Sequence, residues 1–394
     1  MIHRVEIENY GSIRERQVID LRIPATAPDL ERFARPMGDE SVRLPTVVAF
    51  FGPNASGKST VLRAMANVLE FAASSVYQQP PPILFFQPFR MTSWRSRPTA
   101  VLADFDGSWI GEGMHVYRYQ LRIGHGSTPA GSRVEHESLW IKDGLRFRFL
   151  FKRDEQTIRC AKELQLTPSD ERLKAVRQDA SVISTMALLN HNFFRAIQDR
   201  FANTLRYIAG YHAAPDPSAV LSFFKSNKDA LEDLILKLSR LDIGLKSVEL
   251  EDTPRGLVAA FTHDGLDGTV GLSEESNGTQ SFMMKFPSFW LSLAKGLPAL
   301  IDEFDIDLHP MLLSEMLTWF QDPAINRHQA QLFFAAHNVS IMEALEKEEI
   351  YLIEKSRDGA SSIIGLKDVR GVRREPSLQR KYLGGVFGAV PNIG

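Results

Sequence analysis

One run of eight residues, from Gly52 to Ser59, constrains the fold of this chain more than any other stretch. It reads Gly-Pro-Asn-Ala-Ser-Gly-Lys-Ser and matches the phosphate-binding pattern G-x-x-x-x-G-K-[ST] at every specified position. The apolar run 47–51 precedes it, as a short buried strand would, and apolar residues at helical spacing follow it at 60–69. In this context backbone N–H groups and a helix N-terminus converge on phosphate oxygens. The sequence therefore predicts a binding site for a nucleoside triphosphate.

The positions of this loop have expected roles. Lys58 would reach the terminal phosphates and take part in catalysis, and the Ser59 hydroxyl would ligate Mg²⁺. A plain glycine-rich turn is the alternative interpretation, and the motifs described below weigh against it. The predicted nucleotide-binding residues of the loop are Gly52, Pro53, Asn54, Ala55, Ser56, Gly57, Lys58, Ser59 and Thr60.

Two carboxylates follow a second apolar run, at 297–301. A buried strand there would deliver Asp302 and Glu303 to the carboxyl edge of an α/β sheet, where ligands bind. Asp302 would hold Mg²⁺, usually through water, and Glu303 would be the general base that polarises the attacking water. Acidic residues at a strand end are also common on protein surfaces. Together with Lys58 and Ser59, however, the catalytic interpretation is favoured.

Two further residues are candidates for the same site. His337 follows the apolar run 331–336 and would sense the γ-phosphate or steady the water; a core histidine bonded to backbone is the alternative. Gln87 lies in the proline-rich, aromatic segment 77–98. ATPases of this general kind place a glutamine between Mg²⁺ and the attacking water, and by that resemblance Gln87 would be a metal-site residue. An ordinary surface glutamine is the equally weighted alternative for Gln87.

A polar loop at 272–280 precedes an apolar helix at 282–295. Ser276, Asn277 and Gly278 would stand at the N-terminus of this helix, which is a good place to meet an anion. A polar capping loop is the alternative. In the nucleotide-binding interpretation these three residues complete the predicted set.

The chain divides into three predicted parts of an α/β protein. Residues 1–158 form the first part, with the phosphate loop and an antiparallel β meander. Residues 159–245 are nearly free of glycine and follow a helical pattern, which predicts a helical insertion. Residues 246–394 begin with strands and form the last part, with the polar loop, the two carboxylates and His337.

Local patterns predict individual elements. Alternating apolar and polar residues predict a strand at 17–23 and the paired strands of the meander between 101 and 152. Residues 24–45, rich in Pro, Ala, Asp and Arg, are expected to form an irregular loop over the nucleotide edge. Apolar residues at helical spacing predict a helix over 181–207, with its aromatic stripe in the core.

Composition limits the other functions open to the chain. The 46 basic and 48 acidic residues give a net charge of −2, so the overall basic footprint of a nucleic-acid binder is absent, although a local patch stays open. The single cysteine, Cys160, rules out an intramolecular disulfide framework and suits a reducing cytosol. The N-terminus alternates like a strand, and the apolar stretch 286–301 is interrupted by Lys295, Gly296 and Pro298. A cytoplasmic protein without a membrane partner is expected.

Together these motifs resemble an ABC-type ATPase, with a Walker A loop, a signature loop, a Walker B strand and a switch histidine. A narrower likeness rests on four stretches: the Asn-Tyr-Gly-Ser at 9–12, the loop at 51–60, Asp302-Glu303 followed by Leu308-His309-Pro310, and the ending Tyr-Leu-Gly-Gly-Val-Phe-Gly-Ala-Val-Pro at 382–391. These stretches look like the AAA15/AAA21 group of OLD-like ABC ATPases, which are related more distantly to RecF and SMC heads. The resemblance implies an ABC-type P-loop NTPase head with a mixed central sheet, and ATP and Mg²⁺ as its ligands.

The resemblance also implies a second copy of the chain. In ABC-type ATPases two heads sandwich ATP, and each supplies its signature loop to the phosphate loop of the other. Ser276 and Gly278 of one subunit would then face Lys58 of another, in a homodimer or a higher homo-oligomer. Asn277 stands where the usual Ser-Gly-Gly-Gln signature has its first glycine, which implies slower or partner-dependent closure. The D-loop at 306–309 also differs, so the residue that crosses the interface is left open.

Stand-alone members of this group resemble the ATPase subunits of two-gene bacterial anti-phage or restriction-linked systems. The resemblance implies an ATPase whose ATP-driven dimerisation senses a trigger, or holds and releases a separate nuclease-like or toxic effector. The alternative is a RecF- or SMC-like clamp that closes on DNA in repair, with a strong dependence of binding on salt. Its footprint would be two basic clusters, Arg90, Arg95 and Arg97, and Arg370, Arg373, Arg374, Arg380 and Lys381.

Overall fold

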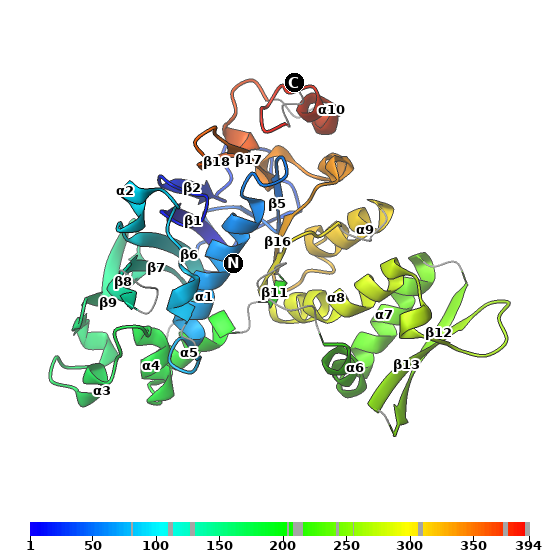
Figure 1. The fold of residues 1–394 in the computed structure, drawn as a ribbon, viewed down its shortest axis with the longest axis horizontal. Coiled ribbons are helices and arrows are strands. Elements are labelled where there is room, and N and C mark those ends of the chain that lie inside the picture. Colours follow the sequence, from blue (N-terminus) through cyan, green and yellow to red (C-terminus); the bar gives the residue numbers. More distant parts are fainter. Residues whose placement is uncertain are drawn as a thin grey trace.

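The computed structural model describes the chain except residues 80–81, 109–112, 127–130, 203–204, 208–215, 242–243, 255, 306–309, 373–376 and 391–394. Two large sheets organise it (Figure 1). The central sheet has the strand order β11 (Leu205–Tyr207), β15 (Pro298–Ile301), β16 (Gln331–Ala335), β5 (Val47–Phe51), β17 (Ile350–Lys355) and β18 (Ser361–Gly365). The first five strands are parallel and β18 is antiparallel to β17, so the predicted mixed central sheet is confirmed.

The central sheet is buried on both faces, which explains the uninterrupted apolar run of β5. Val48 and Phe50 pack into one hydrophobic core, while Val47, Ala49 and Phe51 pack into another on the opposite face. Parallel sheets covered on both sides need such continuous apolar strands. The sheet therefore separates two cores, and its carboxyl edge is where the polar residues that follow β5, β15 and β16 emerge.

The second sheet is the predicted antiparallel meander. Its order is β10 (Thr157–Cys160), β9 (Arg146–Asp154), β8 (Arg133–Asp143), β7 (Met114–Gly124), β6 (Thr99–Ser108), β1 (Ile2–Glu8) and β2 (Gln17–Asp20). Along β7, Tyr117 and Tyr119 are buried whereas Arg118 and Arg122 lie on the wetter face. The strand predicted to reach residue 23 ends at Asp20.

Helix α1 (Lys58–Ser74) lies between the two sheets and contacts β1 and β6 on one side and β15 and β16 on the other. Apart from its first turn the helix is buried on nearly all sides, as expected of a helix enclosed in a core. The helix that starts at the phosphate loop is therefore held rigidly between both sheets.

The helices expected within 159–245 are present, but they pack in two places (Figure 1). Helices α3 (Glu171–Lys174), α4 (Val182–Leu188) and α5 (Asn192–Ala202) join the meander and α1, whereas α6 (Pro217–Ser226) and α7 (Lys228–Leu241) pack on α8 in the other core. The segment does not form a single insertion, because β11 within it pairs with β15.

The continuous helix predicted over 181–207 is wrong. Asn190 adopts a left-handed φ of 61° after α4, and the backbone N–H of His191 donates to the carbonyl of Met186 (3.0 Å). This is a Schellman ending, which closes a helix. A second helix then starts at Asn192, and Leu205 lies on strand β11 instead of a helix.

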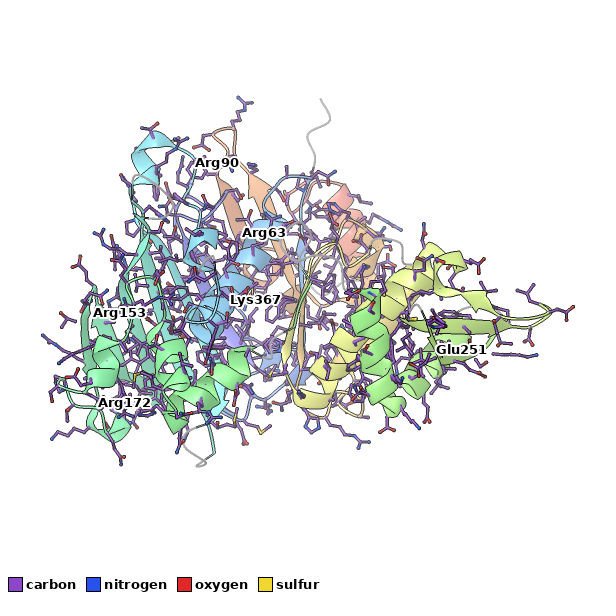
Figure 2. The ribbon with its side chains drawn as sticks, turned by 60° about the horizontal axis from the view of Figure 1, so that its bottom comes forward. Arg63, Arg90, Arg153, Arg172, Glu251 and Lys367 are labelled. Atoms are coloured by element: carbon purple, nitrogen blue, oxygen red, sulfur yellow. The ribbon has the colours of Figure 1, made fainter. Side chains whose placement is uncertain are left out.

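A smaller layer projects beyond α6 and α7. It consists of β12 (Leu245–Thr253), β13 (Gly256–His263) and β14 (Val270–Gly271), and Glu251 lies on β12 in this layer (Figure 2). Helices α8 (Asn277–Lys295), α9 (Pro310–Gln321) and α10 (Leu378–Leu383) cover the second face of the central sheet. The remaining short elements are β3 (Phe33–Ala34), β4 (Leu44–Pro45), α2 (Thr92–Arg95) and 3₁₀ turns at Pro82–Phe85, Lys162–Leu164, Leu272–Glu274, Val339–Ala344, Lys347–Glu349 and Leu366–Asp368.

The loop at 24–45 lies at the opposite end of the sheet from its expected place over the nucleotide. The hydroxyl of Thr46, just before β5, donates to the carbonyl of Arg32 (3.1 Å), and Gln329, just before β16, donates to the carbonyl of Arg35 (2.9 Å). These contacts are at the amino ends of the strands. The buried guanidinium of Arg43 holds the loop together, because it donates hydrogen bonds to the backbone carbonyls of Pro24, Ala27 and Pro28 in the same loop.

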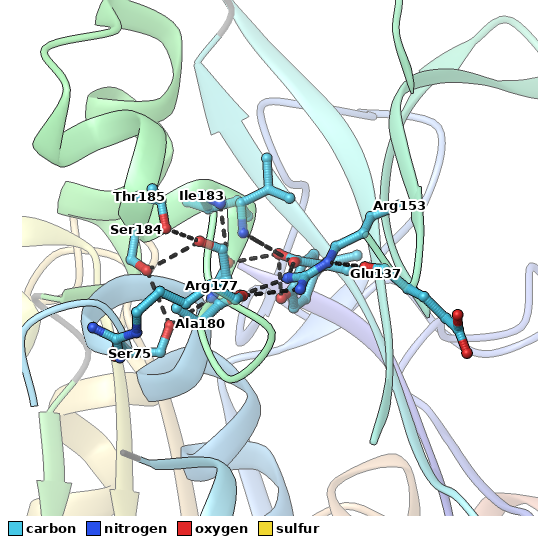
Figure 3. A network of polar contacts seen from close by, with 12 residues as sticks. Ser75, Glu137, Arg153, Arg177, Ala180, Ile183, Ser184 and Thr185 are labelled. Carbon is cyan, nitrogen blue, oxygen red and sulfur yellow. Dashed lines mark hydrogen bonds and ion pairs between the residues drawn. The ribbon is translucent and has the colours of Figure 1, made fainter. Parts of the chain in front are cut away.

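A buried polar network joins the end of α1 to β8, β9 and α4 (Figure 3). The carboxylate of Glu137 is fully buried and accepts hydrogen bonds from the Ser181 hydroxyl (2.5 Å) and the Val182 N–H (2.9 Å). The guanidinium of Arg153 lies 3.6 Å from it. The hydroxyl of Ser75, the C-cap residue of α1, accepts a hydrogen bond from the Ser181 N–H (2.8 Å). The network fixes the helical segment onto the meander.

Two further observations complete the fold. Cys160 ends β10, is partly buried, and has its thiol pKa raised to about 11, mainly by burial. Within the described part of the chain, no helix has the length and apolar content needed to cross a bilayer.

Candidate nucleotide site

The phosphate loop connects β5 to α1 as its sequence predicts, and two glycines allow its shape. A Cβ on Gly52 would lie 2.2 Å from the carbonyl oxygen of Ile353, and Gly57 has a left-handed φ of 117°. A Cβ on Gly57 would also meet the hydroxyl of Ser361 at 2.4 Å. Both positions therefore admit only glycine without rearrangement. The loop is a main-chain cradle of the kind that holds phosphate oxygens.

Lys58 begins α1 and turns its ammonium back into this loop. Its Nζ donates to the carbonyls of Gly52 (2.8 Å) and Pro53 (3.1 Å), and the side chain is buried. Burial lowers the pKa of Lys58, while the carboxylates of Asp302 and Asp305 act to raise it. A buried cation next to the cradle is what terminal phosphates would engage.

The two predicted carboxylates follow β15 directly. Asp302 is buried, and Glu303 has a left-handed φ of 53°, which a non-glycine residue adopts at a cost of about 1–3 kcal/mol. The turn is held in place because the N–H of Phe304 donates to the carbonyl of Ala335 (3.1 Å) on the neighbouring strand. Strain of this kind is typical of residues that the fold forces toward a functional cleft.

His337 follows β16, and its side chain is exposed at the carboxyl edge of the sheet. It is therefore not the core histidine of the alternative interpretation. Its backbone N–H donates to the carboxylate of Asp305 (2.8 Å).

These elements meet in one cleft of about 510 Å³. The cleft brings Glu303 and His337 together with the phosphate loop, at the carboxyl ends of three parallel strands. Its lining residues are Ser12, Asn54, Ala55, Ser56, Gly57, Lys58, Ser59, Thr60, Arg63, Glu303, His337 and Lys355. The hydroxyl oxygen of Ser56 is buried and, in the described part of the chain, has no hydrogen-bond partner.

Three lining residues were not predicted. Ser12 belongs to the Asn-Tyr-Gly-Ser turn, whose side chain bonds to Thr60 (3.2 Å), and Lys355 ends β17. Arg63 lies one turn after Ser59 on α1 (Figure 2). The position of Arg63 could have been predicted, because it lies four residues after Ser59 on the same helix. Ser12 and Lys355 reach the cleft only through strand pairing between distant parts of the chain.

Comparison with known proteins gives the family. Residues 47–343 match the AAA_21 family model, described as "AAA domain, putative AbiEii toxin, Type IV TA system". The chain belongs to the AAA_21 family. No curated protein matched it.

Solved structures similar to this AAA_21 chain include heads of SMC proteins. An SMC head bound to the C-winged helix domain of ScpA is 16% identical, with a TM-score of 0.53, over 92% of this chain and 97% of that chain. A Pyrococcus yayanosii Smc head with a coiled coil and joint is 11% identical, with a TM-score of 0.49, over 98% and 99% of the two chains. The SMC head domain from Thermotoga maritima is 15% identical, with a TM-score of 0.45, over 92% and 98%. At these identities the first likeness shows the fold alone, and that fold is the ABC-type P-loop ATPase head expected from the sequence.

Gln87 does not line the phosphate cleft of the AAA_21 chain. It lines an adjoining hollow of about 860 Å³, which shares Ser12, Thr60, Arg63 and Lys355 with the cleft. Its exposed side-chain amide donates to the carbonyl of Leu84 (2.6 Å). The structure therefore does not bring Gln87 into the cleft lined by Ser59, as its predicted metal role would require.

The signature loop also lies outside the cleft of its own chain. Ser276 caps α8 by accepting from the N–H of Thr279 (3.1 Å), and Ser276 and Asn277 are exposed. Neither residue, nor Gly278, lines the cleft. The predicted D-loop at 306–309 lies outside the described residues, as do Arg373 and Arg374 of the second basic cluster.

Proposed function

We propose that this AAA_21 chain binds ATP with Mg²⁺ and hydrolyses it. One observation carries the proposal: a single cleft holds the main-chain cradle of the phosphate loop, a buried lysine, a strained glutamate and an exposed histidine. Each of these groups has a role in phosphoryl transfer, and they come from three separate segments of the chain.

The residues fit a Mg²⁺–nucleotide complex. The Ser59 hydroxyl and the buried Asp302 carboxylate would hold Mg²⁺, which when bound neutralises charge on the phosphate oxygens. Lys58 and the loop amides stabilise the negative charge that develops on the γ-phosphoryl group. Glu303 orients the water and accepts its proton as the bond to the bridging oxygen breaks, and His337 contacts the γ-phosphate.

Steady-state hydrolysis of ATP tests this assignment. Glu303→Gln keeps the shape of the side chain without its basicity, so turnover should fall by about 10²–10⁴-fold while nucleotide binding persists. Lys58→Ala should abolish binding, because the loop loses the buried ammonium that contacts its own backbone. Glu251→Gln, an exposed glutamate on β12, is the matched control and should behave like the wild type. Wild-type turnover in the Glu303→Gln variant would refute the assignment.

We further propose that two copies close over ATP and complete each other's sites. The exposed cap of α8 supports this, because Ser276, Asn277 and Gly278 do not line the cleft of their own chain and would meet ATP only through a second chain. Light scattering of Glu303→Gln with and without Mg-ATP measures the change directly. A shift from one subunit to two supports closure; a mass unaffected by ATP contradicts it.

We propose as the biological role the control of a separate effector protein in bacterial anti-phage defence. The nucleotide bound to the dimer would decide whether this nuclease-like or toxic partner is held or released. The family description, which names a toxin of a type IV toxin–antitoxin system, supports a role of this kind. Co-expression of a neighbouring gene product with wild-type chain or Lys58→Ala tests it, with cell growth as the readout. Growth that is the same with both chains would argue against nucleotide control. Steeply salt-dependent binding of duplex DNA would instead favour the alternative function, a RecF- or SMC-like protein that closes on DNA.

A further inference from the structure

A third carboxylate lies in the turn after β15, two residues beyond Glu303. One oxygen of Asp305, Oδ2, accepts hydrogen bonds from the backbone N–H of His337 (2.8 Å) and from the backbone N–H of Asn338 (2.5 Å). Two successive amides thus point at a single carboxylate oxygen. Hydrogen bonds from N–H groups to a charged oxygen are roughly twice as strong as neutral ones. Asp305 therefore clamps the backbone at the point where the loop after β16 carries His337.

Other contacts hold the ends of this loop but not its two central amides. The N–H of Ala336 donates to the carbonyl of Phe50 (3.4 Å) on β5, which extends the sheet by one residue. The side chain of Asn338 is turned forward and accepts from the N–H of Ser340 (3.0 Å), where it caps the following 3₁₀ turn. Between these two contacts, the orientation of His337 depends on Asp305.

The other oxygen of Asp305 is left free by these two amides. This atom, Oδ1, is buried and has no hydrogen-bond partner in the described part of the chain. Asp302 and Asp305 are the two carboxylates whose charge acts on the ammonium of Lys58. Asp305 is thus bonded to the loop that carries His337 and close enough to Lys58 for its charge to act on it, although it does not line the cleft itself.

We propose that Asp305 is a positioning residue: it fixes the backbone under His337 so that the imidazole stands in the phosphate cleft, and it thereby couples the acidic turn after β15 to the loop after β16. The inference rests on the proposed ATPase function of that cleft. Asp305 acts through His337 and not on the nucleotide. A misplacement of about 1 Å in a catalytic group costs about 10²-fold in rate, so a clamp on its backbone controls turnover.

Two substitutions separate the clamp from the charge. Asp305→Ala removes both acceptor oxygens, and kcat for ATP should fall by about 10²-fold, as in His337→Ala, with a much smaller change in KM. Asp305→Asn keeps one carbonyl oxygen that can accept from both amides, so it should retain most of the turnover. Asp322→Ala is the matched control, because the Asp322 carboxylate also accepts a backbone N–H, from Ala324 (2.8 Å), in an exposed turn after α9.

A double-mutant cycle shows whether Asp305 acts through the histidine. In a His337→Ala background, Asp305→Ala should lower kcat by less than twofold, since the group that it positions is already absent. Independent, multiplying losses in the double variant would overturn the proposal. So would an Asp305→Asn variant as slow as Asp305→Ala, because the charge would then matter and the clamp would not.

Amide hydrogen exchange tests the clamp without any catalysis. The N–H groups of residues 337 and 338 should exchange at least tenfold faster in Asp305→Ala than in the wild type or in Asp322→Ala. Unchanged exchange would overturn the clamp even if activity fell. Conversely, a wild-type chain that does not hydrolyse ATP, or a His337→Ala variant as active as the wild type, would refute the proposed function of the cleft, while exchange would still decide whether Asp305 holds the loop.

Discussion

Replacing Glu137 with alanine should destabilise the meander and the helices on it by about 3–5 kcal/mol, the usual loss when one partner of a buried ion pair is removed. The carboxylate of Glu137 serves three donors in a fully buried position: the Tyr119 hydroxyl (3.0 Å), the Ser181 hydroxyl and the Val182 N–H. Alanine leaves all three without an acceptor, and each buried unsatisfied group costs about 1–3 kcal/mol. The guanidinium of Arg153, whose pKa burial already lowers, also loses its counter-charge.

Calorimetric unfolding and hydrogen exchange measure this loss together. A destabilisation of this size should lower the melting temperature of the meander and its helices by about 10 °C, at roughly 2–4 °C per kcal/mol for a domain of 150–250 residues. The amides at the start of α4 should exchange faster, because the Val182 N–H loses its acceptor. Glu137→Gln keeps one acceptor oxygen and should cost less than alanine.

A surface ion pair provides the control for this prediction. Glu171 is 82% exposed and pairs with Lys174 at 2.6 Å, so Glu171→Ala should change stability by at most about 1 kcal/mol. If Glu137→Ala also cost less than about 1 kcal/mol, the network would contribute no more than a surface pair. The conclusion that Glu137 stabilises the meander and its helices through the buried polar network would then be wrong.

Burial raises the pKa of Glu349 from near 4.5 to about 7, so between these pH values the folded chain keeps a proton that the unfolded chain has lost. Stability should fall as pH rises from 4.5 through 7, and urea unfolding of Glu349→Gln at pH 5 and pH 8 should show a smaller fall. Gly57→Ala should prevent nucleotide binding measured by fluorescent ATP, because its Cβ would lie 2.4 Å from the Ser361 hydroxyl; removal of that hydroxyl in Ser361→Ala should restore binding only in part, since φ stays at 117°. Mixing inactive Lys58→Ala and Ser276→Arg chains should recover some ATP turnover, because a mixed dimer contains one complete site; no recovery at any ratio would contradict shared sites.

The parts of the site that local sequence encodes could be predicted. Gly57 and Lys58 lie in a short motif with its strand and helix adjacent, and Asp302 and Glu303 follow a strand that is apolar throughout because both its faces are buried. Asp305 escaped prediction although it is only two residues further on. Its role depends on amides of residues 337 and 338, which the β15–β16 pairing brings to it.

The helical region shows a second limit of sequence reasoning. The apolar spacing of α5 and α6 marks a buried face on each helix, but it carries no information on which of two cores receives that face. The break at Asn190 was visible in principle, since asparagine often ends helices in a left-handed conformation. The placement of residues 24–45 at the amino ends of β5 and β16 depended on contacts with Gln329, which is distant in sequence.

The single cysteine makes this chain convenient for distance measurements in solution. The thiol of Cys160 is partly buried and its pKa is raised to about 11, so little thiolate forms near neutral pH and maleimide probes should react with it slowly. A cysteine introduced by Asn277→Cys at the exposed start of α8 should be labelled well ahead of it. Energy transfer between two chains labelled there, one with a donor dye and one with an acceptor, would then report how closely the copies approach as nucleotide is added.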